Sequence, residues 1–149
     1  MTSCFKPAQV ADLLDIGEQK LRYWREHLDP NPYRSEFSIM DLLAFRIILV
    51  LIEKRNFTAN QLEKFKLIEL FVWCNETKIN VIEQTVLEIH TARLTLSFLD
   101  NLNKPDLNDY DADYISLKGI VSMHDEKVNS IGCENWEKRV FDARAKTHH

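Results

Sequence analysis

Five polar side chains lie close together near the start of the chain and can donate hydrogen bonds to nucleic acids. Gln19 and Lys20 suit contacts with the edges of bases in the major groove of DNA. Arg22, Tyr23 and Arg25 suit contacts with phosphate oxygens, which fix the register of a protein without reading sequence. Charged residues on a small helix often form only its solvent-exposed face. The alternative to nucleic-acid binding is therefore that these side chains are ordinary surface residues.

Two short helices joined by a turn are expected to position these side chains. Apolar residues recur at helical spacing over residues 7–14, which predicts the first helix. Residues 15–17 form the turn, in which Gly17 is free to take a positive φ. The second helix is predicted over residues 18–27, with Trp24 among its inward residues, so that the polar cluster lies on its other faces.

A loop and a long buried helix complete the predicted N-terminal unit. Residues 28–36 contain two prolines and an asparagine, which favour a loop or a short wing, and Arg34 lies within it. Ser38 and Asp41 have the spacing of a capping box. The helix predicted to follow, over residues 39–55, is apolar on nearly all sides and is therefore expected to be the buried centre.

The order of these features resembles the DNA-binding domain of the MerR family, over residues 5–66. The resemblance is carried by Leu-Arg-Tyr-Trp at 21–24, Arg25-Glu26, Leu28, the proline-containing loop, Arg34, Phe37-Ser38 and Asp41-Leu42. It implies a winged helix-turn-helix, with Arg22 and Tyr23 on the DNA backbone, Trp24 in the core and Arg34 in the wing. The predicted DNA-binding residues are Gln19, Lys20, Arg22, Tyr23, Arg25 and Arg34.

The wing departs from the pattern of the family. MerR-type wings usually continue with a Gly-Tyr-Arg-Arg-Tyr-like stretch, whereas only Ser35 and Glu36 separate Arg34 from Phe37. A short wing with an acid in place of a base predicts weaker DNA contacts or a different geometry.

A long helix for dimerisation is predicted over residues 79–103. Its apolar residues repeat every seven positions over about three heptads, which is typical of a coiled coil. The family dimerises through such antiparallel helices, and two-fold symmetry would match a palindromic site. Packing within a single chain is the alternative. The predicted dimer contacts are Ile82, Ile89, Ala92, Leu96 and Leu99.

The other segments are expected to be helical or irregular. Thr58 is expected to cap a fourth helix over residues 59–73. Residues 114–123 fit either a short helix or a strand, and residues 134–146 fit an amphipathic helix. The predicted fold class is mainly α: a winged helix-turn-helix, a long dimerisation helix and a small C-terminal helical region. The predicted segments are residues 1–66, 67–104 and 105–149.

The composition narrows the classes of protein that fit. With only 3 Gly and 4 Pro in 149 residues, a many-stranded β-sandwich or barrel is disfavoured. Residues 1–66 carry ten basic and nine acidic side chains, a net charge of +1, and residues 67–149 carry nine and fourteen, a net charge of −5. DNA contacts are therefore expected to use a local basic cluster. Neither a signal peptide nor a membrane span is expected.

The cysteines predict a reducing compartment and no metal site. Cys4, Cys74 and Cys133 are odd in number and widely separated, which suits the cytoplasm. A metal site built from Cys74 and Cys133 across a dimer is less favoured than cysteines with no special role, because no histidine has ligand spacing. No metal and no cofactor are predicted.

The leading functional prediction is a sequence-specific transcriptional regulator that binds double-stranded DNA as a homodimer. Two alternatives stay open: a phage or mobile-element DNA-architectural protein, such as an excisionase or small packaging subunit, and a protein-interaction module that has lost DNA binding. The C-terminal region is a possible site for a protein partner. An enzyme is not predicted, because no phosphate-binding loop, dinucleotide turn or metalloprotease motif occurs.

Overall fold

Helix α3 (Ile39–Lys54) lies at the centre of the structure, a computed structural model that describes residues 4–100 and 112–131. Its residues from Asp41 to Leu49 are all buried, which confirms the prediction of a buried central helix. The capping box is confirmed as well. The backbone N–H of Asp41 donates to Ser38 Oγ at 3.0 Å, and the N–H of Ser38 donates to the Asp41 carboxylate at 2.9 Å.

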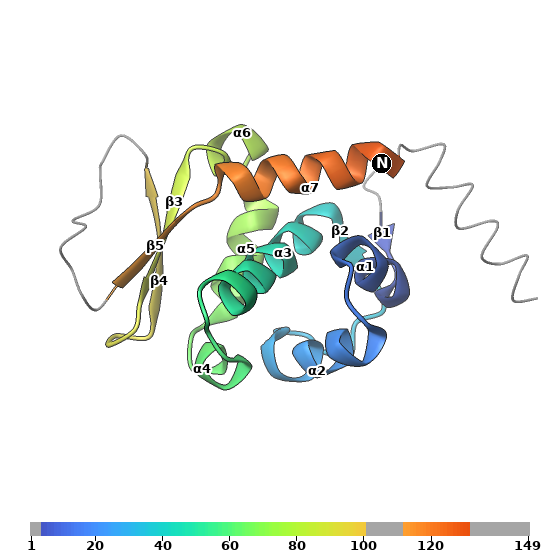
Figure 1. Cartoon of the computed structure of the whole chain (residues 1–149), viewed down its shortest axis with the longest axis horizontal. Coiled ribbons are helices and arrows are strands. Elements are labelled where there is room, and N and C mark those ends of the chain that lie inside the picture. Colours follow the sequence, from blue (N-terminus) through green and yellow to red (C-terminus); the bar gives the residue numbers. More distant parts are fainter. Residues whose placement is uncertain (1–3, 101–111, 132–149) are drawn as a thin grey trace, which may run out of the picture.

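Helices α1 (Pro7–Leu14) and α2 (Glu18–Leu28) form the predicted pair and pack on each other. Helix α1 also packs on α3, whereas α2 packs on α4 (Ala59–Glu63). Figure 1 shows them on one side of α3, with α2 at the margin of the molecule. The turn between them differs from the prediction in one residue. Asp15 takes the left-handed conformation, with φ 59°, whereas Gly17 is extended, with φ −70°. Asp tolerates this conformation better than most side chains do, so the turn does not need its glycine there.

A two-stranded sheet joins the start of the chain to the start of α3. Strand β1 (Cys4–Phe5) pairs antiparallel with β2 (Phe37–Ser38), so that Phe5 lies opposite Phe37. Both phenylalanines are buried in the hydrophobic core. Residues 29–36 therefore form a loop that is tethered at one end by α2 and at the other by this sheet.

The segment predicted as a fourth helix is divided in two. Helix α4 (Ala59–Glu63) begins with the expected cap, in which Thr58 Oγ1 accepts from the backbone N–H of Gln61 at 3.1 Å. A break follows, and α5 (Leu67–Glu76) packs against α3. The ring of Phe71 on α5 meets that of Phe45 edge-on, with centroids 5.0 Å apart. Because α5 packs against α3, the chain changes direction between α4 and α5.

The prediction of a long dimerisation helix is wrong. Its residues form a short helix α6 (Ile79–Ile82) and a hairpin of two strands, β3 (Thr85–His90) and β4 (Thr95–Asp100). The residues predicted to form the coiled-coil seam are used differently. Ile82, Ile89 and Leu96 are buried within the same chain, Leu99 is partly buried on β4, and Ala92 is exposed in the turn between the strands.

Two further elements finish the described fold. Strand β5 (Ala112–Ser116) pairs antiparallel with β3, which gives a three-stranded sheet in the order β4–β3–β5. Helix α7 (Lys118–Ile131) then packs across α3 (Figure 1). The segment 114–123, which fitted a helix or a strand, contains the end of a strand and the start of a helix. The helix predicted over residues 134–146 lies outside the described residues.

The fold class therefore combines helices with a sheet and is not mainly α. The described residues form seven helices, a three-stranded antiparallel sheet and a small strand pair. One hydrophobic core runs from Phe5 to Val121 and includes residues from each of the three predicted segments. Within residues 4–100 and 112–131, no helix combines the length and the apolar character needed to cross a membrane.

Candidate nucleic-acid interface

The outward face of α2 carries four of the six residues that were predicted to bind DNA. Gln19, Lys20, Arg22 and Tyr23 are all exposed, and the side chain of Tyr23 has an exposed fraction of 44%. Among the described residues, none holds the Arg22 guanidinium by a hydrogen bond or an ion pair. Its five donors are therefore available to a ligand.

Lys20 and Tyr23 have weak contacts within the protein. The Lys20 ammonium lies 3.5 Å from a carboxylate oxygen of Glu53 and 5.2 Å from the centre of the Trp24 ring. Both side chains of this ion pair are nearly half exposed, so the pair adds little stability and can open for another anion. Tyr23 packs against His27 with ring centroids 4.4 Å apart, and His27 contacts Glu63 of α4.

Arg25 points toward the loop that follows α2. Its Nη2 donates to the carbonyl of Pro32 at 2.8 Å and also to the carbonyl of Arg34. The guanidinium also lies 5.0 Å from the centre of the Phe37 ring, and its side chain is 16% exposed. The structure thus places Arg25 as a link between α2 and the loop.

Arg34 is likewise turned toward the protein. Its guanidinium contacts the carboxylates of Asp29, at 3.2 Å, and of Asp41, at 3.0 Å. The same group lies over the Phe37 ring at 4.5 Å and over the Phe71 ring at 5.3 Å. Burial raises the pKa of the Asp29 carboxyl, and this neighbouring guanidinium opposes the rise. In this state Arg34 does not extend from the surface as a wing residue would.

Asp41 connects this group of residues to α5. In addition to Arg34 and the backbone of Ser38, its carboxylate accepts a hydrogen bond from Asn75 Nδ2 at 2.8 Å. Ser38 Oγ donates to Asn75 Oδ1 at 2.7 Å, and Asn75 also donates to the carbonyl of Phe71. We call the set Arg25, Asp29, Arg34, Ser38, Asp41 and Asn75 the polar network. It fixes the loop to α2, α3 and α5 at once.

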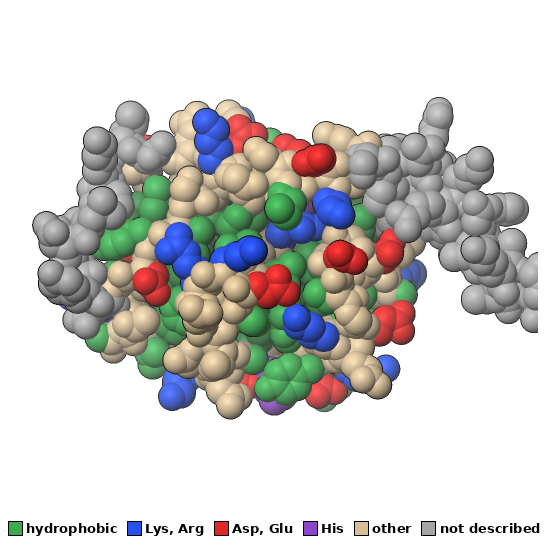
Figure 2. Space-filling view, viewed as in Figure 1, with side chains coloured by type: hydrophobic (Ala, Val, Ile, Leu, Met, Phe, Trp, Pro, Cys, Tyr) green, Lys and Arg blue, Asp and Glu red, His purple; other side chains and the backbone are tan. Residues whose placement is uncertain are grey.

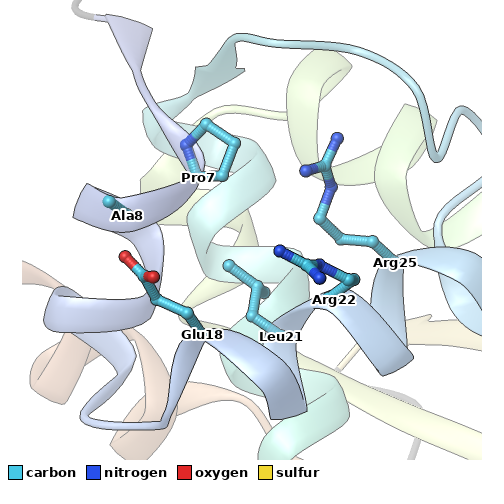
Figure 3. A pocket seen from close by; sticks show the side chains of 6 residues that line it. All are labelled: Pro7, Ala8, Glu18, Leu21, Arg22 and Arg25. Atoms are coloured by element: carbon cyan, nitrogen blue, oxygen red, sulfur yellow. The ribbon is translucent and has the colours of Figure 1, made fainter.

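A shallow pocket of about 240 Å³ lies where the starts of α1 and α2 approach each other. Figure 3 shows Glu18 and Arg22 extending from α2 toward this space, with Pro7 and Ala8 of α1 on the opposite side. One acidic residue, Glu18, and two basic residues, Arg22 and Arg25, therefore line the pocket. It can accept a phosphate through Arg22 only where that phosphate stays clear of Glu18.

The charges on the surface are mixed. Figure 2 shows Lys and Arg side chains interspersed with Asp and Glu on the face in view. On this face the pattern gives no broad positive field, in line with the near-neutral charge of residues 1–66. An interaction with DNA would therefore depend on individual contacts more than on long-range attraction.

No metal centre can be assigned within the described residues. No group of three or more His, Cys, Asp or Glu side chains there is close enough to hold an ion. Cys74 is fully buried on α5, and burial, together with the nearby Asp41, raises the pKa of its thiol to about 12. Cys133 lies outside the described residues.

Cys74 is expected to resist alkylation in the folded protein. A thiol with a pKa of about 12 has roughly one thiolate in ten thousand at pH 8, and the thiolate is the reactive form. Iodoacetamide labelling followed by peptide mass spectrometry would measure this residue separately from Cys4 and Cys133. Labelling of Cys74 should appear only in denaturant, and rapid labelling of the native protein would contradict its burial.

Sequence reasoning missed two of the six residues of the polar network, Asp29 and Asn75, and most of the contacts between its members. Asp29 and Asn75 had no signal of their own, because a loop acid and an asparagine in a helix are common surface residues. Asp41 was recognised as a capping residue, but its contacts with Arg34 and Asn75 depend on the packing of α5. Tyr33, at the tip of the loop, is 94% exposed and was also not singled out.

No protein-family model, no curated protein and no solved structure matches this chain.

Proposed function

We propose that the protein binds double-stranded DNA through α2, as the second helix of a helix-turn-helix. The observation that carries the proposal is the outward face of this helix, on which Arg22 and Tyr23 are exposed and Arg22 has no partner among the described residues. A recognition helix needs apolar anchors on its inner face as well as polar groups on its outer face. Leu21, Trp24 and Leu28 supply these anchors.

The residues are proposed to divide into two kinds of contact. Gln19 and Lys20 lie in the first turn of α2, which is the part that reaches base edges when such a helix enters the major groove. Arg22 and Tyr23 follow on the exposed face and are assigned to phosphates. Arg25 and Arg34 are left out of the direct contacts, because their guanidinium groups are engaged within the protein.

The biological role that fits this activity best is transcriptional regulation, as the resemblance to the MerR family suggested. We further propose that two copies of the protein bind one DNA site. This homodimer does not use the coiled coil that the sequence predicted. A palindromic site occupied by two copies would support it. A phage or mobile-element architectural role requires the same contacts and differs in whether the bound DNA is bent.

Replacing Arg22 by alanine is expected to weaken DNA binding by about tenfold or more, because a charge-assisted hydrogen bond to phosphate is lost. The probe would be a duplex selected by the wild-type protein from a random pool, and the measurement fluorescence anisotropy over a range of salt. The log–log salt slope should become shallower by about 0.9, the value for one phosphate contact.

A matched control is Arg93→Ala, which removes the same charge from the exposed turn between β3 and β4. This variant should keep the affinity and the salt slope of the wild type. Equal losses in both variants would mean that binding follows net charge and not α2. Absence of binding by the wild type, even at low salt, would refute the proposal.

A protein-interaction role is the second candidate. The observation that favours it is the acidic character of the surroundings of α2, where Glu53 and Glu63 contact Lys20 and His27. These carboxylates repel a DNA backbone but suit a basic protein surface. If the wild type retains no DNA, Arg22 and Tyr23 become the residues to vary in a search for a protein partner.

A further inference from the structure

We propose that the loop of residues 29–36 makes a second contact with the DNA backbone, through Tyr33, and that Arg25 and Arg34 hold it in place. The inference rests on the proposed function, since it assumes that α2 lies on DNA. It assigns a contact to a residue that the sequence did not single out. It also changes the roles of two arginines, from groups that bind phosphate to groups that position a tyrosine.

The side chain of Tyr33 is presented by a loop that is fixed on both sides of it. The residues before and after it, Pro32 and Arg34, both direct their carbonyls to the guanidinium of Arg25. Asp29 closes the start of the loop by accepting from the backbone N–H of Asn31 at 2.9 Å. The tyrosine itself is 94% exposed. A side chain on a preorganised loop loses little backbone entropy when it binds.

The loop is also tied to the interior. Arg34 bridges Asp29 in the loop and Asp41 on α3, with contacts of 3.2 and 3.0 Å. Its guanidinium is sandwiched near two aromatic rings, Phe37 and Phe71. An arginine held by two carboxylates and two rings is poorly placed to leave for a phosphate, because both buried acids would lose their ion pair with it. Its contacts instead keep Tyr33 at a constant place beside α2.

The position of the loop follows from the length of α2. Eleven residues make a helix of about 16 Å, whereas the major groove of DNA is about 12 Å wide. When the first turn of α2 meets base edges, its last turn and the segment after it lie near the phosphates that border the groove. Tyr33 is five residues beyond the end of α2, and its phenol can donate a hydrogen bond to a phosphate oxygen.

The test uses Tyr33→Phe, which removes only the hydroxyl group. The affinity for the selected duplex should fall by about tenfold, as for a hydrogen bond to a charged group. The salt slope should stay at the wild-type value, because a neutral phenol does not displace a counterion. Since Tyr33 is almost fully exposed, the variant should fold normally, which thermal unfolding followed by circular dichroism would check.

The positioning role of Arg25 is tested with Arg25→Lys, which keeps the charge but loses the fork that reaches two carbonyls. Affinity should fall with no change in salt slope. In the Tyr33→Phe background the same substitution should have little further effect, because Arg25 acts through Tyr33. Were Arg25 a direct phosphate ligand, lysine would largely replace it, and the losses from the two sites would multiply.

The outcomes separate this inference from the proposed function. If the wild type does not bind duplex DNA at low salt, both fail. If the wild type binds and depends on Arg22 but Tyr33→Phe binds equally well, only the loop contact is wrong. A Tyr33→Phe variant that keeps DNA affinity would leave the exposed tyrosine for a protein partner.

Discussion

Replacing Asp41 by alanine is expected to lower the free energy of unfolding by about 3–5 kcal/mol, because it leaves a largely buried guanidinium without one of its two carboxylates. The same change removes the cap that the Asp41 carboxylate provides to the backbone of Ser38 and the acceptor for Asn75. Urea denaturation of the variant and of the wild type, followed by tryptophan fluorescence, would measure the difference.

The control for this prediction is Glu36→Ala. Glu36 forms an ion pair with Lys6 at 3.4 Å, but both side chains are more than half exposed. Such pairs contribute at most about 1 kcal/mol, so the control should unfold close to the wild type. A loss of less than about 1 kcal/mol for Asp41→Ala would mean that the polar network does not hold the loop, α3 and α5 together.

The protein is expected to lose stability below pH 6.5 through one buried histidine. His124 on α7 is 1% exposed, and burial, aided by the positive charge of Arg46 on α3, lowers its pKa from 6.5 to about 4. Arg46 is itself buried, donates to the carbonyl of Leu13 at 2.8 Å and has its own pKa lowered by burial. Two groups that can each carry a positive charge thus lie together between α7 and α3.

The sign of the effect follows from the depressed pKa. Between pH 6.5 and about 4 the unfolded chain binds a proton at His124 that the folded protein does not, so stability falls as the pH falls through this range. At pH 5 the loss relative to pH 8 is about 2 kcal/mol for this residue, from 1.36 kcal/mol per pH unit. Denaturation curves at a series of pH values would record it.

The variant that isolates this contribution is His124→Leu, which keeps an apolar contact with α3 and has no ionisable group. Its stability should fall less between pH 8 and pH 5 than that of the wild type, with carboxylates accounting for what is left. His27→Leu is the matched control, because His27 is an exposed partner of Glu63. It should retain the steeper wild-type dependence. If both variants follow the wild type, His124 is not the group responsible.

The helices at the start of the chain were predictable because their signals are local. Capping depends on residues three positions apart, and the capping box expected at Ser38 and the cap expected at Thr58 are both present. Helix α3 is apolar on nearly all sides, and this marked it as the centre before any neighbour was known. Apolar spacing also located α1 and α2 to within one residue.

The hairpin of β3 and β4 was mistaken for a helix because its turn contains none of the residue types that usually mark turns. Residues 91–94 are Thr-Ala-Arg-Leu, with no Gly, Asn, Asp or Pro, and Leu94 takes a left-handed conformation with φ 55°. Such a conformation is unfavourable for leucine and is imposed by the pairing of the strands. The alternation of Leu87, Glu88 and Ile89 was the available sign of a strand, but the seven-residue repeat matched a helix over a longer stretch.

The candidate site also contains residues that local spacing could place and residues that only distant contacts could orient. Gln19, Lys20, Arg22 and Tyr23 could be assigned to an outer helix face from sequence, since helical spacing fixes which residues share a face. The orientation of Arg25 and Arg34 could not be predicted from sequence, because it depends on carbonyls and carboxylates contributed by the loop, α3 and α5. Long basic side chains have enough reach to turn either way, and only their partners decide.

The sequence by itself determined the helices whose caps and apolar faces are local, the buried centre in α3 and the exposed polar face of α2. Tertiary structure decided what depends on contacts between distant segments: the sheet built from residues 85–116, the division of α4 from α5, and the polar network that fixes the loop around Tyr33. The physical reason is that a helix satisfies its backbone hydrogen bonds within itself, whereas strands and buried ion pairs need partners that neighbouring residues do not specify.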